Sequence, residues 1–385
     1  MSRIRTQVYL DHAATSPMLA KVQDVMRAVE GEAFGNASSA HWAGDRALAV
    51  LDSARRAVLG RFGGGDRVIF TSGATESNLI GLLGTALGEG FDRIVVSAIE
   101  HESVNAAARL AERLGISVER CGVDELGRLD LEELNWRLSG GPAAVGVVHA
   151  SNEVGTVQPV AQIAELVHAR GSRLHLDLAQ SFGKVAMTEA RAADTWGISG
   201  HKIGGPKGIG ALIIGSDVRL ESPIGGGSQE DGLRHGTHNV AGAAGLACAA
   251  VENDPVVIGP ELQARADHLR SAIAYDVPDI RWTGDPENRA PHLVSAIVPG
   301  VPGEMLVASL DVLGIAASVG SACAARKDPS GKAGALRAMG ASKADAVCSV
   351  RFSVGLDTAS SEISSAAPLI TETIHRLREV VSAQV

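Results

Sequence analysis

Short apolar segments alternate with helical ones through the middle of the chain. Five segments have the composition of β-strands, at residues 67–70, 93–97, 144–149, 173–177 and 210–214. Their apolar runs lack a clean apolar–polar alternation, which is typical of strands buried on both faces. Helical segments at 76–87, 103–114 and 159–170 follow the first three strands. The pattern predicts an α/β fold with a mostly parallel sheet, in which ligands bind beyond the carboxyl ends of the strands.

This alternation stops near residue 255. A break is expected at 252–255 and again at 259–260, and beyond it strands are fewer and a last helix is expected at about 361–381. The chain has 385 residues, which exceeds what one ordinary core holds. We therefore predict a large domain over 15–255 and a smaller α+β domain formed by 1–14 and 256–385.

The composition narrows the possible partners. The formal net charge is −9, which argues against a surface for nucleic acid or anionic membranes. No apolar run approaches the roughly 18 residues that cross a bilayer. Residues 1–7 lack the apolar segment of a secretory signal. We expect a cytoplasmic protein with no membrane partner and no direct nucleic-acid partner.

The four cysteines are dispersed, at positions 121, 248, 323 and 348, and no C-x-x-C pair occurs. A self-contained zinc site or dithiol motif is therefore not expected, and we predict no metal ligands. Cys121, Cys248 and Cys348 lie in or beside strand-like or helical stretches, where a buried structural thiol is the expected role. Cys323 lies within 318–325, whose residues are too small to pack its sulfur into a core. We interpret Cys323 as a reactive thiol on a loop.

Residues 71–78 (TSGATESN) connect a predicted strand to a predicted helix. Small residues let backbone N–H groups approach a ligand, and the start of a helix attracts anions. The segment could therefore hold a phosphate, with the hydroxyl of Thr75 as a further donor. An ordinary N-capped helix explains the same residues, because serine and threonine cap helices routinely. The sequence leaves both explanations open.

Asp177 ends a predicted buried strand, and Lys202 follows 25 residues later among glycines. A buried carboxylate is costly unless it is paired, and pyridoxal 5'-phosphate (PLP) needs such a carboxylate to keep its ring nitrogen protonated. The glycines around Lys202 would let its amine move between a cofactor and a substrate. The alternatives are an aspartate that caps the next helix and a solvated surface lysine.

Three other polar residues are candidates for the same site. His101 could stack on a pyridine ring and transfer protons, although a loop histidine at a helix start is the plainer explanation. Asn152 follows a strand and could donate a hydrogen bond to a ring oxygen or a carboxylate. Arg351 could bind a substrate carboxylate through two hydrogen bonds or form a structural ion pair.

Together these motifs resemble the NifS/IscS-like cysteine desulfurases, in the class-V aminotransferase branch of fold-type I PLP enzymes. The resemblance extends over almost the whole chain and implies a large PLP-binding domain with a mostly parallel seven-stranded sheet flanked by helices. The matching segments are 9–15 (YLDHAAT), 34–39 (FGNASS), 71–78 (TSGATESN), 100–101 (EH), 151–155 (SNEVG), 175–181 (HLDLAQS), 199–202 (SGHK), 234–237 (RHGT), 320–323 (GSAC) and 350–353 (VRFS).

The resemblance assigns a role to each candidate residue. It implies that Lys202 holds PLP as a Schiff base, Asp177 pairs with the ring nitrogen, Gln180 bonds the ring hydroxyl and His101 stacks on the ring. Asn152 and Arg351 would hold the carboxylate of L-cysteine, and Cys323 would accept its sulfur. The phosphate would be bound by Ala74, Thr75, Ser199 and His201, with Thr237 from the other subunit of a homodimer.

The implied reaction converts L-cysteine to L-alanine and leaves a persulfide for a sulfur-acceptor protein, which could be a scaffold, a thiolation enzyme or a carrier. Residues 324–334 are longer and more basic than the usual pattern, Ser151 replaces a common asparagine and Asp231 a usual arginine. These departures leave the expected chemistry intact. They do not indicate which protein accepts the sulfur. Two alternatives are another class-V PLP enzyme, such as a C–S lyase or aminotransferase, and a sulfur-assembly scaffold without catalysis.

Overall fold

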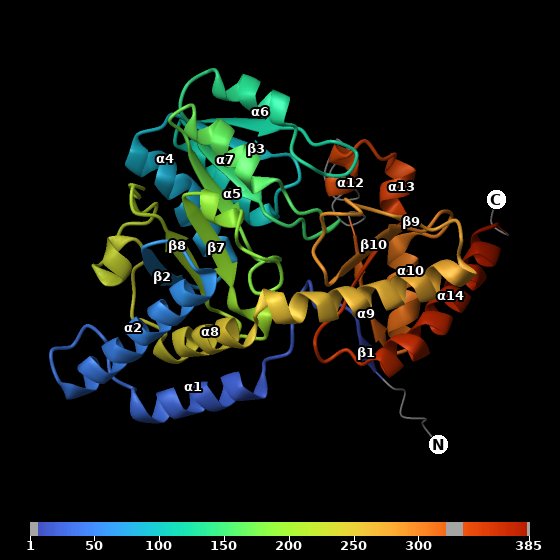
Figure 1. The fold of residues 1–385 in the computed structure, drawn as a ribbon, viewed down its shortest axis with the longest axis horizontal. Coiled ribbons are helices and arrows are strands. Elements are labelled where there is room, and N and C mark those ends of the chain that lie inside the picture. Colours follow the sequence, from blue (N-terminus) through green and yellow to red (C-terminus); the bar gives the residue numbers. More distant parts are fainter. Residues whose placement is uncertain (1–6, 321–333, 383–385) are drawn as a thin grey trace.

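The computed structural model describes residues 7–320 and 334–382. Cys323 therefore lies outside the described residues. The ribbon in Figure 1 shows a large sheet with its helices and a second, smaller sheet. The long helix α9 (Pro255–Asp276) begins beside α8 (Val240–Glu252) of the first part and extends along the second. No helix in these two ranges is long and apolar enough to cross a membrane.

The large sheet has seven strands and confirms the expected fold class. Every neighbouring pair is parallel except those made by β8, which is antiparallel to both β2 and β7. In spatial order the strands are β2 (Arg67–Thr71), β8 (Gly210–Ile214), β7 (Thr195–Ser199), β6 (Arg173–Asp177), β5 (Ala144–Val148), β3 (Arg93–Ser97) and β4 (Ser117–Cys121).

Both faces of this sheet are buried, as the apolar runs predict. Within β8, Ala211 and Ile213 join one hydrophobic cluster while Leu212 and Ile214 join another. One face is covered by α2 (Trp42–Phe62), α6 (Leu131–Leu138), α7 (Val160–His168) and α8 (Val240–Glu252), and α1 (Ala20–Glu32) packs against α8. The other face is covered by α5 (Glu102–Arg113) and by α3 (Ala74–Asn78), which continues through the π-helical turn η1 (Leu79–Leu83) into α4 (Gly84–Glu89).

The second sheet is antiparallel and packs against α9, α10 (Gly303–Val312) and α14 (Ser360–Ser382). Its strands, in order, are β12 (Ser318–Val319), β13 (Ser349–Ser353), β10 (Leu293–Ile297) and β9 (Arg281–Trp282). The short helices α12 (Ala335–Ala338) and α13 (Lys343–Val347) precede β13.

The start of the described chain packs with this C-terminal part. Strand β1 (Val8–Tyr9) pairs in parallel with β11 (Ile315–Ala316), and Val8 and Leu10 enter the cluster formed by α9 and α14. The sequence led us to expect that the first residues complete a smaller domain. The boundaries 15–255, 1–14 and 256–385 remain a prediction.

Two local expectations differ from the structure. Gly259 and Pro260 lie inside α9 and do not interrupt it; burial of Ile258 and Leu262 on either side of them offsets the hydrogen bond that proline cannot donate. Among the cysteines, Cys121 is buried, whereas Cys248 and Cys348 are only partly buried. Their helix and strand neighbours therefore shield these two thiols less than the sequence pattern suggests.

Candidate active site

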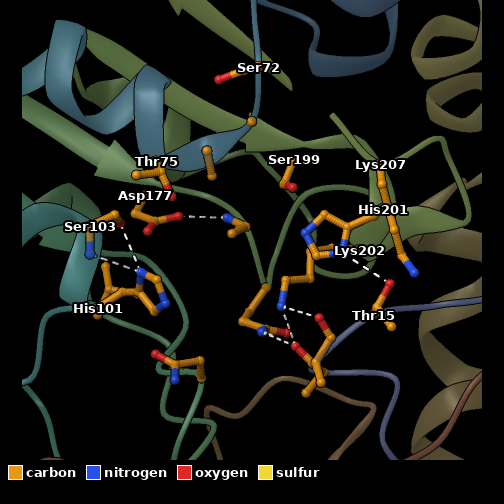
Figure 2. A pocket seen from close by; sticks show the side chains of 18 of the residues that line it. Thr15, Ser72, Thr75, His101, Ser103, Asp177, Ser199, His201, Lys202 and Lys207 are labelled. Atoms are coloured by element: carbon orange, nitrogen blue, oxygen red, sulfur yellow. Dashed lines mark hydrogen bonds between the residues drawn. The ribbon is translucent and has the colours of Figure 1, made fainter. Parts of the chain in front are cut away.

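A cavity of about 710 Å³ opens at the carboxyl ends of β6 and β7. Side chains from several separate segments face it, and Figure 2 shows the labelled ones gathered around one space. Ten residues predicted from the sequence line it: Ala74, Thr75, His101, Asn152, Asp177, Gln180, Ser199, His201, Lys202 and Arg351. Thr237 is exposed and does not line the cavity of its own chain, and Cys323 lies outside the described residues.

Asp177 is buried at the end of β6, with only 3% of its surface exposed. Its Oδ1 accepts a hydrogen bond from the backbone N–H of Ala179 at 2.8 Å, and its Oδ2 accepts one from Nδ2 of Asn78 at 2.7 Å. Both donors are uncharged, and the described residues provide no ion pair to this carboxylate. A buried carboxylate without a cation favours the binding of a cationic ligand atom beside it.

The amide of Asn78 is itself held in one orientation. Its Nδ2 also donates to Oγ of Ser103 at 2.8 Å, while its Oδ1 lies 3.1 Å from Nε2 of His175. Burial lowers the pKa of His175 to about 3, so its ring is neutral. With Nδ1 2.9 Å from the hydroxyl of Thr195, Nε2 carries the hydrogen that Asn78 accepts. This arrangement directs the Nδ2 donor of Asn78 toward Asp177.

One wall of the cavity is rich in hydrogen-bond donors. Gly73, before α3, has φ 156° and ψ 178°, a conformation essentially restricted to glycine. A Cβ at Gly73 would meet no atom within 4 Å, so the absence of a side chain leaves space beside the first N–H groups of the helix. The hydroxyls of Thr75 and Ser199 and the ring of His201 line the same cavity. Such a donor set is suited to a phosphate.

Lys202 lies in the 3₁₀ turn η3 (Gly200–Ile203), directly after β7. Its Nζ donates hydrogen bonds to the carbonyls of Ala13 at 2.5 Å and Ala14 at 2.8 Å, which Figure 2 marks with dashed lines. Burial, together with the charge of Arg351, lowers the pKa of the amine to about 8. An amine with this pKa can act as a nucleophile or a base near neutral pH.

His201 lies beside Lys202 and shares its environment. Its Nδ1 lies 3.1 Å from Oγ1 of Thr15. Burial and the positive charge of Lys202 lower the pKa of His201 to about 4, so the ring is neutral at physiological pH. It therefore offers one N–H donor and no charge.

His101 directly precedes α5, forms its N-cap and lines the cavity. Its Nδ1 accepts a hydrogen bond from the backbone N–H of Ser103 at 3.1 Å and lies 2.8 Å from the hydroxyl of that residue. The ring therefore caps a helix, as the plainer explanation expects, and it also lines the cavity, while its stacking on a pyridine ring stays a prediction.

Arg351 reaches the cavity from β13 of the second sheet. It donates to the carbonyl of Asn152 at 2.8 Å and to Oδ1 of Asp11 at 3.0 Å. Its Nε is buried and has no hydrogen-bond partner in the parts of the chain that are described. The guanidinium is thus both a structural ion-pair partner and a lining group with an unused donor.

Several lining residues were not singled out from the sequence. Ala13, Ala14 and Thr15 contribute carbonyls and a hydroxyl, and they lie in the 9–15 segment, for which no role was assigned. Ser103 and Lys207 also line the cavity. Gly205 and Gly208 flank the Pro206–Lys207 pair, a signal that could have identified this lysine, whereas a backbone carbonyl cannot be identified from a pattern of side chains.

The chain was compared with known proteins. The family model described as Aminotransferase class-V matches residues 8–365. The cysteine desulfurase IscS 1 of Archaeoglobus fulgidus is 39% identical over 325 residues, which cover 83% of this chain and 84% of that protein. The putative cysteine desulfurase IscS 1 of Bacillus subtilis is 36% identical over 386 residues, which cover 96% of this chain and 99% of that protein. Among solved structures, a NifS-like protein has a TM-score of 0.85 at 30% identity, covering 96% of this chain and 100% of its own.

The lowered pKa of Lys202 can be measured directly. Trace labelling of the ligand-free protein with acetic anhydride, followed by peptide mass spectrometry, should show half-maximal labelling of Lys202 near pH 8, because only the uncharged amine reacts. Lys21 is the control, since its hydrogen bond to Glu252 raises the pKa of its amine above the ordinary value. Coincident labelling profiles for the two lysines would contradict this picture of the site.

Proposed function

The chain belongs to the class-V aminotransferase family, and we propose that it is a PLP-dependent cysteine desulfurase. It would convert L-cysteine to L-alanine and retain the sulfur as a persulfide on Cys323. One observation carries this proposal: the same cavity holds Asp177, which is buried without an ion-pair partner among the described residues, and Lys202, whose amine has a pKa lowered to about 8. The names of the relatives support the choice of cysteine as substrate.

The residues present fit PLP, which has a basic ring nitrogen, a phosphate and a carbonyl carbon. Asp177 supplies the carboxylate for the ring nitrogen, Lys202 the amine for the carbonyl carbon, and His101 a ring that faces the same cavity. Gln180 would bond the ring hydroxyl. The phosphate would take the donors of Ala74, Thr75, Ser199 and His201. When bound, PLP supplies an electron sink that stabilises negative charge at Cα of an amino acid.

The chain's own groups account for the remaining tasks. Arg351 and Asn152, which both line the cavity, would hold the substrate carboxylate. The Lys202 amine would take the Cα proton, and His101 would take the proton of the substrate thiol. The Cys323 thiolate would then form the S–S bond as the C–S bond breaks. The products are alanine and the persulfide, so no external oxidant is needed.

We propose that the enzyme acts in the cytoplasm, where thiols stay reduced. The persulfide sulfur would pass to an acceptor protein, such as a scaffold, a thiolation enzyme or a carrier. A C–S lyase or an aminotransferase would use the same cavity without Cys323. A scaffold without catalysis would need neither Cys323 nor the lowered pKa of Lys202.

Lys202→Ala should abolish alanine formation, because the variant lacks the amine that is proposed to bind PLP and to take the Cα proton. Lys207→Ala is the matched control, since this lysine lines the same cavity. Borohydride treatment of the PLP-loaded protein, followed by peptide mass spectrometry, should place the PLP mass on Lys202 in the wild type and in Lys207→Ala. A PLP mass on Lys207 in the wild type would contradict the assignment.

Cys323→Ser should separate PLP binding from sulfur transfer. Retention of PLP should be unchanged, while alanine formed per enzyme with excess cysteine and reductant should fall on the order of 100-fold or more, because a hydroxyl cannot accept the sulfur. Cys348→Ser is the control, since its partly buried thiol lies outside the cavity. Near-normal turnover by Cys323→Ser would favour a lyase that releases sulfide directly.

We further propose that the active enzyme is a homodimer in which Thr237 completes the phosphate site of the partner. Thr237 is exposed and does not contribute to the described cavity of its own chain, which is what a residue with that role requires.

Mixing two defective variants tests the shared site. In a dimer of Lys202→Ala with Thr237→Ala, one site carries both changes and the other carries neither. Random exchange at equal amounts should therefore restore native sites to about a quarter of the wild-type number. PLP retained and alanine formed would be measured before and after exchange. An active monomer in sedimentation, or no gain on mixing, would contradict the shared site.

A further inference from the structure

A hydrogen-bonded path continues from the candidate active site into the protein interior. The Ala13 carbonyl that accepts from Lys202 also accepts from Nε2 of Gln180 at 2.8 Å. On the other side of the same amide, Oε1 of Gln180 lies 3.1 Å from Nε2 of His292. His292 has no exposed surface and Gln180 has only 3%. The path therefore connects the lysine amine to a buried histidine for which no role has been described.

The partners of Gln180 fix the orientation of its amide. The Ala13 carbonyl can only accept, so the nitrogen of the amide faces it and the oxygen faces His292. A flipped amide would bring two carbonyl oxygens together. One N–H of Gln180 is used by Ala13, and the second remains for a ligand in the cavity that Gln180 lines.

The tautomer of His292 follows from the same geometry. Because Oε1 of Gln180 can only accept, Nε2 of His292 carries the hydrogen. Nδ1 is buried without a hydrogen-bond partner among the described residues, which suits an unprotonated nitrogen. Burial and the positive charge of Lys184 hold the pKa of His292 well below its ordinary value, in agreement with a neutral ring. Nζ of Lys184 lies 3.5 Å from Nε2, farther than Oε1 of Gln180 at 3.1 Å. Burial lowers the pKa of the Lys184 amine to about 7, and the uncharged amine can accept a hydrogen from Nε2, so this contact is compatible with the same tautomer.

The contact joins the two sheets. Gln180 follows β6 of the large sheet, whereas His292 directly precedes β10 of the second sheet. The carbonyl of His292 accepts from the backbone N–H of Val354 at 3.0 Å, so its backbone is tied to the segment after β13. The donor that faces Gln180 is therefore carried by a buried residue whose backbone is hydrogen-bonded to the segment after β13.

We propose that His292 is a positioning residue that holds the Gln180 amide with its nitrogen beside Lys202, where the free N–H can donate to the ring oxygen of PLP. The role rests on the proposed function, since it needs PLP in the cavity. Without the His292 donor, Oε1 of Gln180 would be unpaired and buried, and the amide could turn its oxygen toward the ligand.

Two substitutions of similar size separate donation from packing. H292Q keeps an N–H donor near the position of Nε2, and H292L fills the space without a donor. PLP dissociation constants would be measured by equilibrium dialysis, and the near-visible absorbance of the loaded protein would be titrated with pH. We expect H292L to bind PLP about five- to tenfold more weakly, the effect of one neutral hydrogen bond, with a shifted titration midpoint. H292Q should stay within about twofold of the wild type.

Thermal unfolding of the PLP-free proteins shows whether each variant folds, and H292M replaces H292L if the latter does not. Equal weakening by H292Q and H292L would mean that His292 only fills space, and unchanged binding by H292L would mean that the donor is unimportant. Either result overturns the inference and leaves the proposed function intact. A wild-type protein that fails to bind PLP would instead remove the proposed function, and this inference with it.

Discussion

The site depends on one buried carboxylate. Asp177 ends the middle strand of the large sheet, where the parallel neighbours β5 and β7 bring other strand ends beside it. Its neutral donor Asn78 can reach it only because residue 197 on β7 is a glycine, since a Cβ there would lie 2.5 Å from Oδ1 of Asn78. The sheet register, the helix start and this glycine together create a carboxylate that accepts hydrogen bonds from neutral donors and has no ion-pair partner among the described residues.

Much of the large sheet follows from local sequence pattern. β3, β6 and β8 begin and end at the residues expected, because β3 and β8 contain apolar runs and β6 alternates polar with apolar residues. The antiparallel direction of β8 and the π-helical turn within the 74–89 helical run were not predicted. Strand direction depends on where the chain crosses the sheet, and a single π turn depends on packing against β-strands, so neither leaves a periodic signal.

The candidate site, like the large sheet, has features that the sequence predicts and features that it does not. Polar side chains at strand ends could be predicted, because parallel strands place their carboxyl ends on one edge. The Ala13 carbonyl and His292 could not, since one is a backbone atom and the other meets Gln180 across 112 residues of sequence. Asn78 lies within a recognised motif, but its task becomes apparent only once Asp177 and His175 are placed on either side of it.

The second sheet contributes more than a wall to the cavity. Arg351 on β13 lies opposite Ser318 on β12 in the antiparallel register, and β12 leads directly to the segment that contains Cys323. Strand β13 is also tied to Asn152 and Asp11, through hydrogen bonds that the Arg351 guanidinium donates. A slip of one residue in this ladder would turn Arg351 to the opposite face. The backbone register therefore fixes the group proposed to hold the substrate carboxylate and also the last described residues before the segment that contains Cys323. Substitutions on β12 that disturb pairing should then affect both tasks together, whereas a change at Cys323 affects only one.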